Sequence, residues 1–198
     1  MKVVGITGGV GSGKSTVSFL LHEMTESVLL IADDIGKLMM KKGSSCFDEI
    51  IKEFGKGIID KETGELDRNA LSTSIFSSAE KKEKLEAIVH PAVKKYIEDT
   101  IENNKDKKGI IIFESAIIFD TNTDKYCDEI WFVDVDLETR KKRLKENRGY
   151  SDEKTESILK AQKTDYAKEH SDVVISNNGH KDELREVIKN LIKERNLT

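Results

Sequence analysis

The sequence is poor in the residues and segments that mark secreted, disulfide-bonded or membrane-spanning proteins. Its 198 residues include one proline, two cysteines and one tryptophan. Cys46 and Cys127 lie far apart and form no metal-binding or redox spacing. No apolar run approaches the roughly 20 residues that a membrane helix needs, and the first residues do not resemble a secretory signal. We therefore expect a cytoplasmic protein with no membrane partner.

An excess of positive charge is also missing. The chain has 33 Lys and Arg against 37 Asp and Glu, which gives a formal net charge of −4. Because nucleic-acid-binding domains are usually strongly basic on one face, we expect no nucleic-acid partner. Hydrophobic residues make up 37% of the chain, enough for one core, with or without insertions.

Five short apolar runs predict the strands of a buried parallel sheet. They cover residues 3–7, 28–31, 110–113, 130–135 and 173–175. Runs that do not alternate with polar residues suit strands covered on both faces. Apolar residues at helical spacing follow the first of these runs and recur near the end of the sequence. This spacing predicts a helix in each place. The sequence therefore predicts an α/β fold in which helices flank a parallel sheet.

A long insertion is predicted between the second and third strands, because a crossover between parallel strands needs only about a dozen residues. We expect residues 38–106 to be helical throughout. The expected helix signals are an N-cap at Ser44 or Ser45, an end at Gly55, N-caps at Asp67 and Ser77, and a new helix starting at Pro91.

A second excursion is predicted after the fourth strand. Residues 139–167 begin with a basic helix that contains very few apolar side chains. So thin an apolar stripe favours a mobile lid over a firmly docked helix. The nucleotide-binding core then consists of residues 1–37, 107–138 and 168–198.

The strongest motif is Gly8-x-x-x-x-Gly13-Lys14-Ser15, which fills the template of a phosphate-binding loop (P-loop) between a strand and a helix. Backbone N–H groups of such a loop and of the following helix point at phosphate oxygens. Lys14 would contact the β- and γ-phosphates, and the Ser15 hydroxyl would ligate Mg²⁺. The motif predicts a nucleoside triphosphate and Mg²⁺ as ligands, and the loop residues expected to bind the nucleotide are Gly9, Gly11, Ser12, Gly13, Lys14, Ser15 and Thr16.

An acidic residue follows the second strand. Asp33 would accept the proton of an attacking hydroxyl, hold Mg²⁺, or act as a helix N-cap, and its position leaves all three open. The run Asp33-Asp34-Ile35-Gly36 also matches a short GTPase element, but the guanine-reading Asn-Lys-x-Asp is absent. The helical insertion and the basic lid favour a small kinase.

Two further residues have competing interpretations. Arg143 would bind the transferring phosphoryl group through its planar guanidinium, or belong to a solvated basic helix face. His90 precedes the single proline, and its position is compatible with a structural or a catalytic role.

Over essentially its whole length the chain resembles the dephospho-CoA kinase family. The resemblance is carried by motifs at matching distances along the chain. They are the loop from Gly5 to Ser15, Ala32-Asp33, Leu66-Asp67-Arg68, His90-Pro91, Arg143 with Ser151 and Gln162, and Asp172 to Gly179 with its Asn177-Asn178-Gly179 segment.

The resemblance implies a P-loop core with a helical CoA-binding domain and a lid. It implies transfer of a phosphoryl group from ATP to the ribose 3′-hydroxyl of dephospho-CoA, giving CoA and ADP. The implied roles are catalysis by Asp33, Lys14 and Arg143; substrate binding by Thr7, Asp33, Lys37, His90, Asp120 and Arg143; adenine binding near Asn177 and Gly179; and metal binding by Ser15 and Asp33.

The chain departs from the family pattern in four places. They are Ile31 for an aspartate, Lys37 for an arginine, Ala116 to Asp120 for Pro-Leu-Leu-Phe-Glu, and Asn147 for a second lid arginine. Two other hypotheses therefore stand beside dephospho-CoA kinase: a related kinase for a nucleoside or nucleotide, and a nucleotide-binding regulator without catalysis. Monomer and weak homo-oligomer both fit the sequence.

Overall fold

The chain divides into two compact units in the computed structural model, which describes residues 1–76, 78–162 and 164–197. One unit comprises Met1–Ile31 and Asn103–Thr198, and the other comprises Ala32–Glu102. The second unit begins where the second strand ends, because helix α2 (Ala32–Met39) follows that strand without a loop. The insertion predicted to start at residue 38 thus includes the whole of α2.

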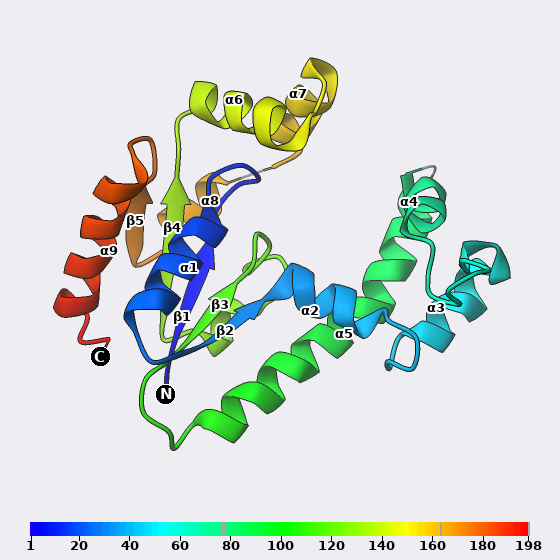
Figure 1. Cartoon of the computed structure of the whole chain (residues 1–198), viewed down its shortest axis with the longest axis horizontal. Helices are drawn as coiled ribbons and strands as arrows, with labels where there is room; N and C mark the ends of the chain where they lie inside the picture. The colour runs from blue at the N-terminus through cyan, green and yellow to red at the C-terminus, as the bar shows by residue number, and fades with distance from the viewer. Residues whose placement is uncertain (77, 163, 198) are drawn as a thin grey trace. The chain divides into compact units, whose positions relative to one another are not determined.

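The first unit is built on a parallel sheet of five strands with the order β2-β3-β1-β4-β5 (Figure 1). The strands are β1 Lys2–Thr7, β2 Ser27–Ile31, β3 Ile110–Glu114, β4 Glu129–Asp134 and β5 Val173–Ser176. They match the five predicted runs, and every pairing is parallel, as predicted. Because β1 lies between β3 and β4, its carboxyl end meets both of their carboxyl ends.

The helices of this unit connect and cover the strands. They are α1 Lys14–Met24, α6 Leu137–Arg148, α7 Asp152–Ala161, α8 Asp165–Glu169 and α9 Lys181–Glu194, with a short 3₁₀ helix η2 at Asp124–Tyr126. Helices α1 and α9 pack together against one face of the sheet. Val4, Ile6 and Trp131 point into that core, while the alternate residue Val3 is also buried, on the opposite face. Burial on both faces explains the continuous apolar runs.

A buried carboxylate stabilises the amino edge of the sheet. Glu129, the first residue of β4, is 5% exposed. Its Oε2 pairs with Lys2 Nζ at 2.7 Å, and its Oε1 accepts from Trp131 Nε1 at 2.9 Å and faces Arg195 Nε at 3.3 Å. One carboxylate thus joins the first strand, the fourth strand and the end of the chain.

Replacing Glu129 by alanine is expected to lower the free energy of unfolding by about 2 kcal/mol, because it removes the shared acceptor of a buried indole N–H. Urea unfolding followed by circular dichroism measures the change. Glu186→Ala is the matched control, since Glu186 pairs with Lys189 on the exposed face of α9, and such pairs contribute little. Equal shifts of the two urea midpoints would contradict this role for Glu129.

The second unit is a helical subdomain with its own small core. It contains α2, α3 Phe47–Phe54, η1 Lys56–Ile58, α4 Arg68–Phe76 and most of α5 Ala79–Asn104. Its buried residues include Cys46, Ile50 and Leu71, which come from different segments. A turn at residues 60–64 is closed by an antiparallel bridge between Ile59 and Leu66. The expectation that this region is helical throughout is therefore wrong for these residues.

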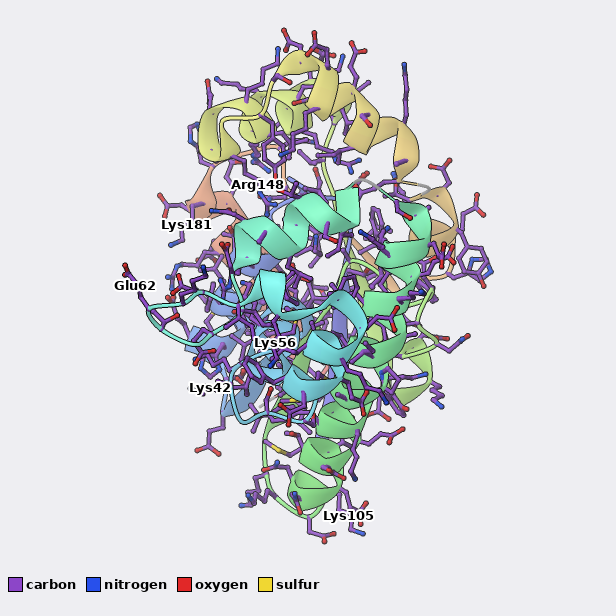
Figure 2. The ribbon with its side chains drawn as sticks, turned by 90° about the vertical axis from the view of Figure 1, so that its right-hand side faces the viewer. Lys42, Lys56, Glu62, Lys105, Arg148 and Lys181 are labelled. Atoms are coloured by element: carbon purple, nitrogen blue, oxygen red, sulfur yellow. The ribbon has the colours of Figure 1, made fainter. Side chains whose placement is uncertain are left out.

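Charged side chains cover the outside of that turn. Glu62 projects from it in Figure 2, where Lys42 and Lys56 of the same unit are also labelled. Asp60 fixes the turn, because its Oδ1 accepts from the backbone N–H groups of Glu62 and Thr63 at 2.9 Å each. These two bonds lower the pKa of the Asp60 carboxyl below its usual range.

The predicted helix ends in this unit have mixed outcomes. Asp67 caps α4 as predicted, since its Oδ1 accepts from the backbone N–H groups of Asn69 and Ala70. Helix α3 ends at Gly55, also as predicted. The N-cap predicted at Ser44 or Ser45 is wrong: Cys46 occupies that position without a side-chain cap. The cap predicted at Ser77 lies outside the described residues.

Pro91 does not begin a new helix. Helix α5 runs unbroken through it from Ala79 to Asn104. A proline inside a helix costs about 3 kcal/mol, because it lacks a donor and its ring crowds the preceding turn. Val89 and Ile97 are buried on either side of it. We attribute the continuity of the helix to this packing, which outweighs the local cost of the proline.

Within residues 1–76, 78–162 and 164–197, no helix has both the length and the apolar character that a bilayer span requires.

Candidate active site

The phosphate-binding loop connects β1 to α1 at the carboxyl edge of the sheet (Figure 1). Gly8, Gly11 and Gly13 have φ angles of 145°, 85° and 91°, which L side chains rarely adopt. Gly13 has a second constraint, because a Cβ there would lie 2.2 Å from Asn177 Nδ2. The glycines of the motif are therefore required by the backbone path and by close packing.

Gly13 caps α1 without a side-chain hydrogen bond, so no side chain at that position occupies the first amides of the helix. Lys14 Nζ donates to the carbonyl oxygens of Gly8 and Gly9 at 3.0 and 3.1 Å, and Ser12 N donates to Gly9 at 3.1 Å. A curled loop with a lysine across it, followed by a helix N-terminus that has no side-chain cap, is suited to bind phosphates.

Arg143 lies at this loop. Its Nη1 donates to the Ser12 carbonyl oxygen at 3.4 Å, and its Nη2 donates to the Asn177 carbonyl oxygen at 2.8 Å. Asn177 is buried, and its Nδ2 also donates to the Ser12 carbonyl oxygen, at 2.7 Å. The alternative in which Arg143 belongs to a solvated helix face is therefore wrong.

Helix α6 is also docked more closely than its composition suggested. Leu144 is fully buried, and a Cβ on Gly11 would lie 3.1 Å from its Cγ. Asp136 caps the helix, and its side chain accepts from Thr139 N at 2.7 Å. One leucine thus docks the helix against the bare backbone of the loop, while the mobile lid stays a prediction.

Glu114 is the residue that the sequence interpretation missed. It ends β3 and is 6% exposed, and its Oε1 accepts from the Ser15 hydroxyl at 2.7 Å. Its Oε2 is buried and has no hydrogen-bond partner within the described part of the chain. The sequence held a partial signal, an acid directly after an apolar run, which indicates a Mg²⁺ site only when the strand is known to lie beside a phosphate loop.

This pair suits a magnesium ion. Mg²⁺ is usually bound by one or two protein ligands, with waters and substrate phosphates completing its shell. The lack of a cluster of three or more ligating side chains among the described residues is compatible with such a site. The Ser15 hydroxyl and the unpartnered Glu114 oxygen supply the hard oxygen donors that Mg²⁺ prefers.

Other predicted residues of this unit lie around the loop or apart from it. Thr7 ends β1, and its buried hydroxyl has no partner in the described structure. Gly179 packs against Glu183 of α9, where a Cβ would lie 1.9 Å from Oε2. Asp120 is exposed in the connection after β3. Neither Gly179 nor Asp120 has a described contact with the phosphate loop.

The remaining predicted residues belong to the helical unit. Asp33 is exposed in the first turn of α2. The N-cap interpretation of Asp33 is wrong, because α2 already begins at Ala32. Lys37 pairs with Asp34 at 2.6 Å on the same helix, and His90 is half-buried in α5.

Comparison with known proteins decides the family. A family model for dephospho-CoA kinase matches residues 2–183. The chain is 36% identical to the dephospho-CoA kinase of Symbiobacterium thermophilum over 93% of this chain and 77% of that protein. It is 39% identical to the dephospho-CoA kinase of Fusobacterium nucleatum over 92% of each. The chain belongs to the dephospho-CoA kinase family.

A solved structure agrees on the fold. Dephospho-CoA kinase from Campylobacter jejuni superimposes with a TM-score of 0.73 at 20% identity, covering 98% of this chain and 97% of that one. The dephospho-CoA kinase family catalyses the final ATP-dependent step of CoA biosynthesis. Membership confirms the predicted family, enzyme class and P-loop fold, and it favours neither the GTPase nor the regulator hypothesis.

Proposed function

We propose that this chain transfers the γ-phosphoryl group of ATP to the ribose 3′-hydroxyl of dephospho-CoA. The observation that carries the proposal is the phosphate loop, with an uncapped helix after it and the Ser15–Glu114 pair beside it. The helix N-terminus and Lys14 would bind the β- and γ-phosphates, and Arg143 would offset negative charge on them during transfer. Asn177 and Gly179 would lie near the adenine of ATP, as in the family pattern.

The magnesium site is part of this proposal. Ser15 and Glu114 would hold the ion; a role of Asp33 as a ligand stays a prediction from the sequence. A bound Mg²⁺ would supply positive charge that offsets the negative charge of the phosphates. The protein contributes the buried Glu114 oxygen, which has no hydrogen-bond partner within the described residues.

Asp33 is proposed as the general base. It follows the last residue of β2 by two positions, and its exposed carboxylate lies near the positive end of α2. The 3′-hydroxyl proton would pass to this carboxylate as the new P–O bond forms and ADP leaves. The helical unit, with Lys37 and His90, would bind the acceptor together with Thr7, Asp120 and Arg143. A lid role of residues 139–167 and a cytoplasmic location stay predictions from the sequence.

An acceptor-dependent ADP assay tests the proposal. We expect rapid ADP formation with ATP, Mg²⁺ and dephospho-CoA, and only background release when dephospho-CoA is left out. CoA is the matched control, because its 3′-oxygen already carries a phosphate. A nucleoside that replaces dephospho-CoA with equal efficiency would favour the related-kinase hypothesis. Equal ADP release without any acceptor would overturn the proposal.

A further inference from the structure

Two side chains outside the phosphate loop bind both backbone groups of Val10. Arg140 of α6 donates from Nε to the Val10 carbonyl oxygen at 2.7 Å. Gln162, at the end of α7, accepts from the Val10 N–H at 2.9 Å through its Oε1. Arg140 Nη2 donates to the same Gln162 oxygen. The three residues close a ring of hydrogen bonds on the outer side of the loop.

The orientation of the Val10 carbonyl also fixes an amide. In a planar trans peptide the C=O and the N–H point in opposite directions, and no peptide bond in the described chain is cis. Because the Val10 carbonyl faces Arg140, the N–H of Gly11 points away from α6. By the same geometry, the Ser12 carbonyl faces Arg143 and Asn177, so the N–H of Gly13 also points away from them.

The loop is shaped to receive Arg140. A Cβ on Gly9 would lie 2.2 Å from Arg140 Nη2 and 2.4 Å from Cζ, so the guanidinium rests against bare backbone. Its two partners are a carbonyl and an amide oxygen, both neutral. Partial burial lowers the pKa of Arg140, but a guanidinium stays protonated in proteins. No carboxylate in this ring offsets the positive charge of Arg140. The charge therefore makes the electrostatic potential around the loop more positive.

We propose that Arg140 and Gln162 are positioning residues that hold the phosphate loop with the Gly11 amide turned toward the nucleotide phosphates. The inference rests on the proposed function, in which this loop binds ATP. Neither residue needs to touch the nucleotide, because Arg140 acts on the Val10 carbonyl and Gln162 acts on the Val10 N–H. A loop that already has its binding conformation loses little conformational entropy when the phosphates bind, so its affinity for the nucleotide is higher.

Nucleotide affinity tests the inference. We expect Arg140→Gln to weaken ADP binding about tenfold, the effect of losing one charge-assisted hydrogen bond that orders the loop. The KM for ATP should rise by a similar factor while the KM for dephospho-CoA and kcat change little. Arg140→Lys keeps the positive charge but loses the forked geometry of the guanidinium. Its affinity for ADP should therefore lie between those of wild type and Arg140→Gln. Isothermal titration calorimetry and initial rates measure these values, with Lys142→Gln, on the exposed face of α6, as the matched control.

A second variant keeps the test independent of the folding of the first. Gln162→Met preserves side-chain size but removes the acceptor, and it should weaken ADP binding in the same direction. Since the ring is shared, the double variant should lose less affinity than the product of the two single losses. Affinity within twofold of wild type in folded Arg140→Gln or Gln162→Met overturns the inference. A wild-type chain that binds ADP but phosphorylates no acceptor would overturn the proposed function alone.

Discussion

Replacing Asp33 by asparagine is expected to lower the rate of phosphoryl transfer about a thousandfold, within the range that general bases contribute. The amide keeps the shape of the side chain but does not accept the proton of the 3′-hydroxyl. ATP binding should be unchanged, because the phosphate loop lies in the other compact unit. Single-turnover rapid quench measures the chemical step directly, so that slow product release does not mask the loss.

Asp48→Asn is the matched control for this change. Asp48 is also exposed in the first turn of a helix of the same unit, α3, and should show a wild-type rate when replaced. Recovery of Asp33→Asn at high Mg²⁺ concentration would assign Asp33 to metal binding instead of proton transfer. A rate within a few-fold of wild type would contradict both roles.

Replacing Glu114 by glutamine is expected to lower kcat about a hundredfold and to raise the Mg²⁺ concentration needed for half-maximal rate. The amide oxygen still accepts from the Ser15 hydroxyl, so the local hydrogen bond is kept. The negative charge next to the metal is lost. Initial rates over a range of Mg²⁺ concentrations at saturating ATP and dephospho-CoA separate the two effects.

Glu129→Gln controls for the loss of any buried carboxylate. Glu114 ends β3 and contacts Ser15, whereas Glu129 begins β4 and contacts Lys2, Trp131 and Arg195 instead. The Glu129 variant should lose stability but keep the wild-type dependence on Mg²⁺, when both are assayed well below their unfolding temperatures. An unchanged Mg²⁺ profile in Glu114→Gln would exclude Glu114 from the metal site.

Much of the first unit could be predicted because its signals are local. Five apolar runs predicted the five strands, and the glycine-rich template predicted the phosphate loop together with Lys14 and Ser15. The position of Arg143 came from the family resemblance, since a basic helix alone does not show which of its cations faces the loop. Asp67 was found as a cap because capping involves only neighbouring residues.

The errors and omissions come from contacts between distant parts of the chain. Arg140 and Gln162 meet Val10 across 130 and 152 residues of sequence, and no spacing rule connects them. Pro91 indicated a helix start because proline favours the first turn of a helix. The prediction failed because local propensity does not include the packing on either side of Pro91. Glu114 was overlooked because an acid at the end of a strand becomes informative only when its neighbour Ser15 is known.

Both ends of the chain are attached to the amino edge of the sheet. The Met1 ammonium donates to the Lys105 carbonyl oxygen at 2.7 Å, Arg195 reaches Glu129 at the start of β4, and Leu197 is buried. The phosphate loop emerges from the opposite edge (Figure 1). An affinity tag or a surface linker fused at either end would therefore attach at the edge away from the loop, which suits immobilised biosensor measurements of nucleotide capture.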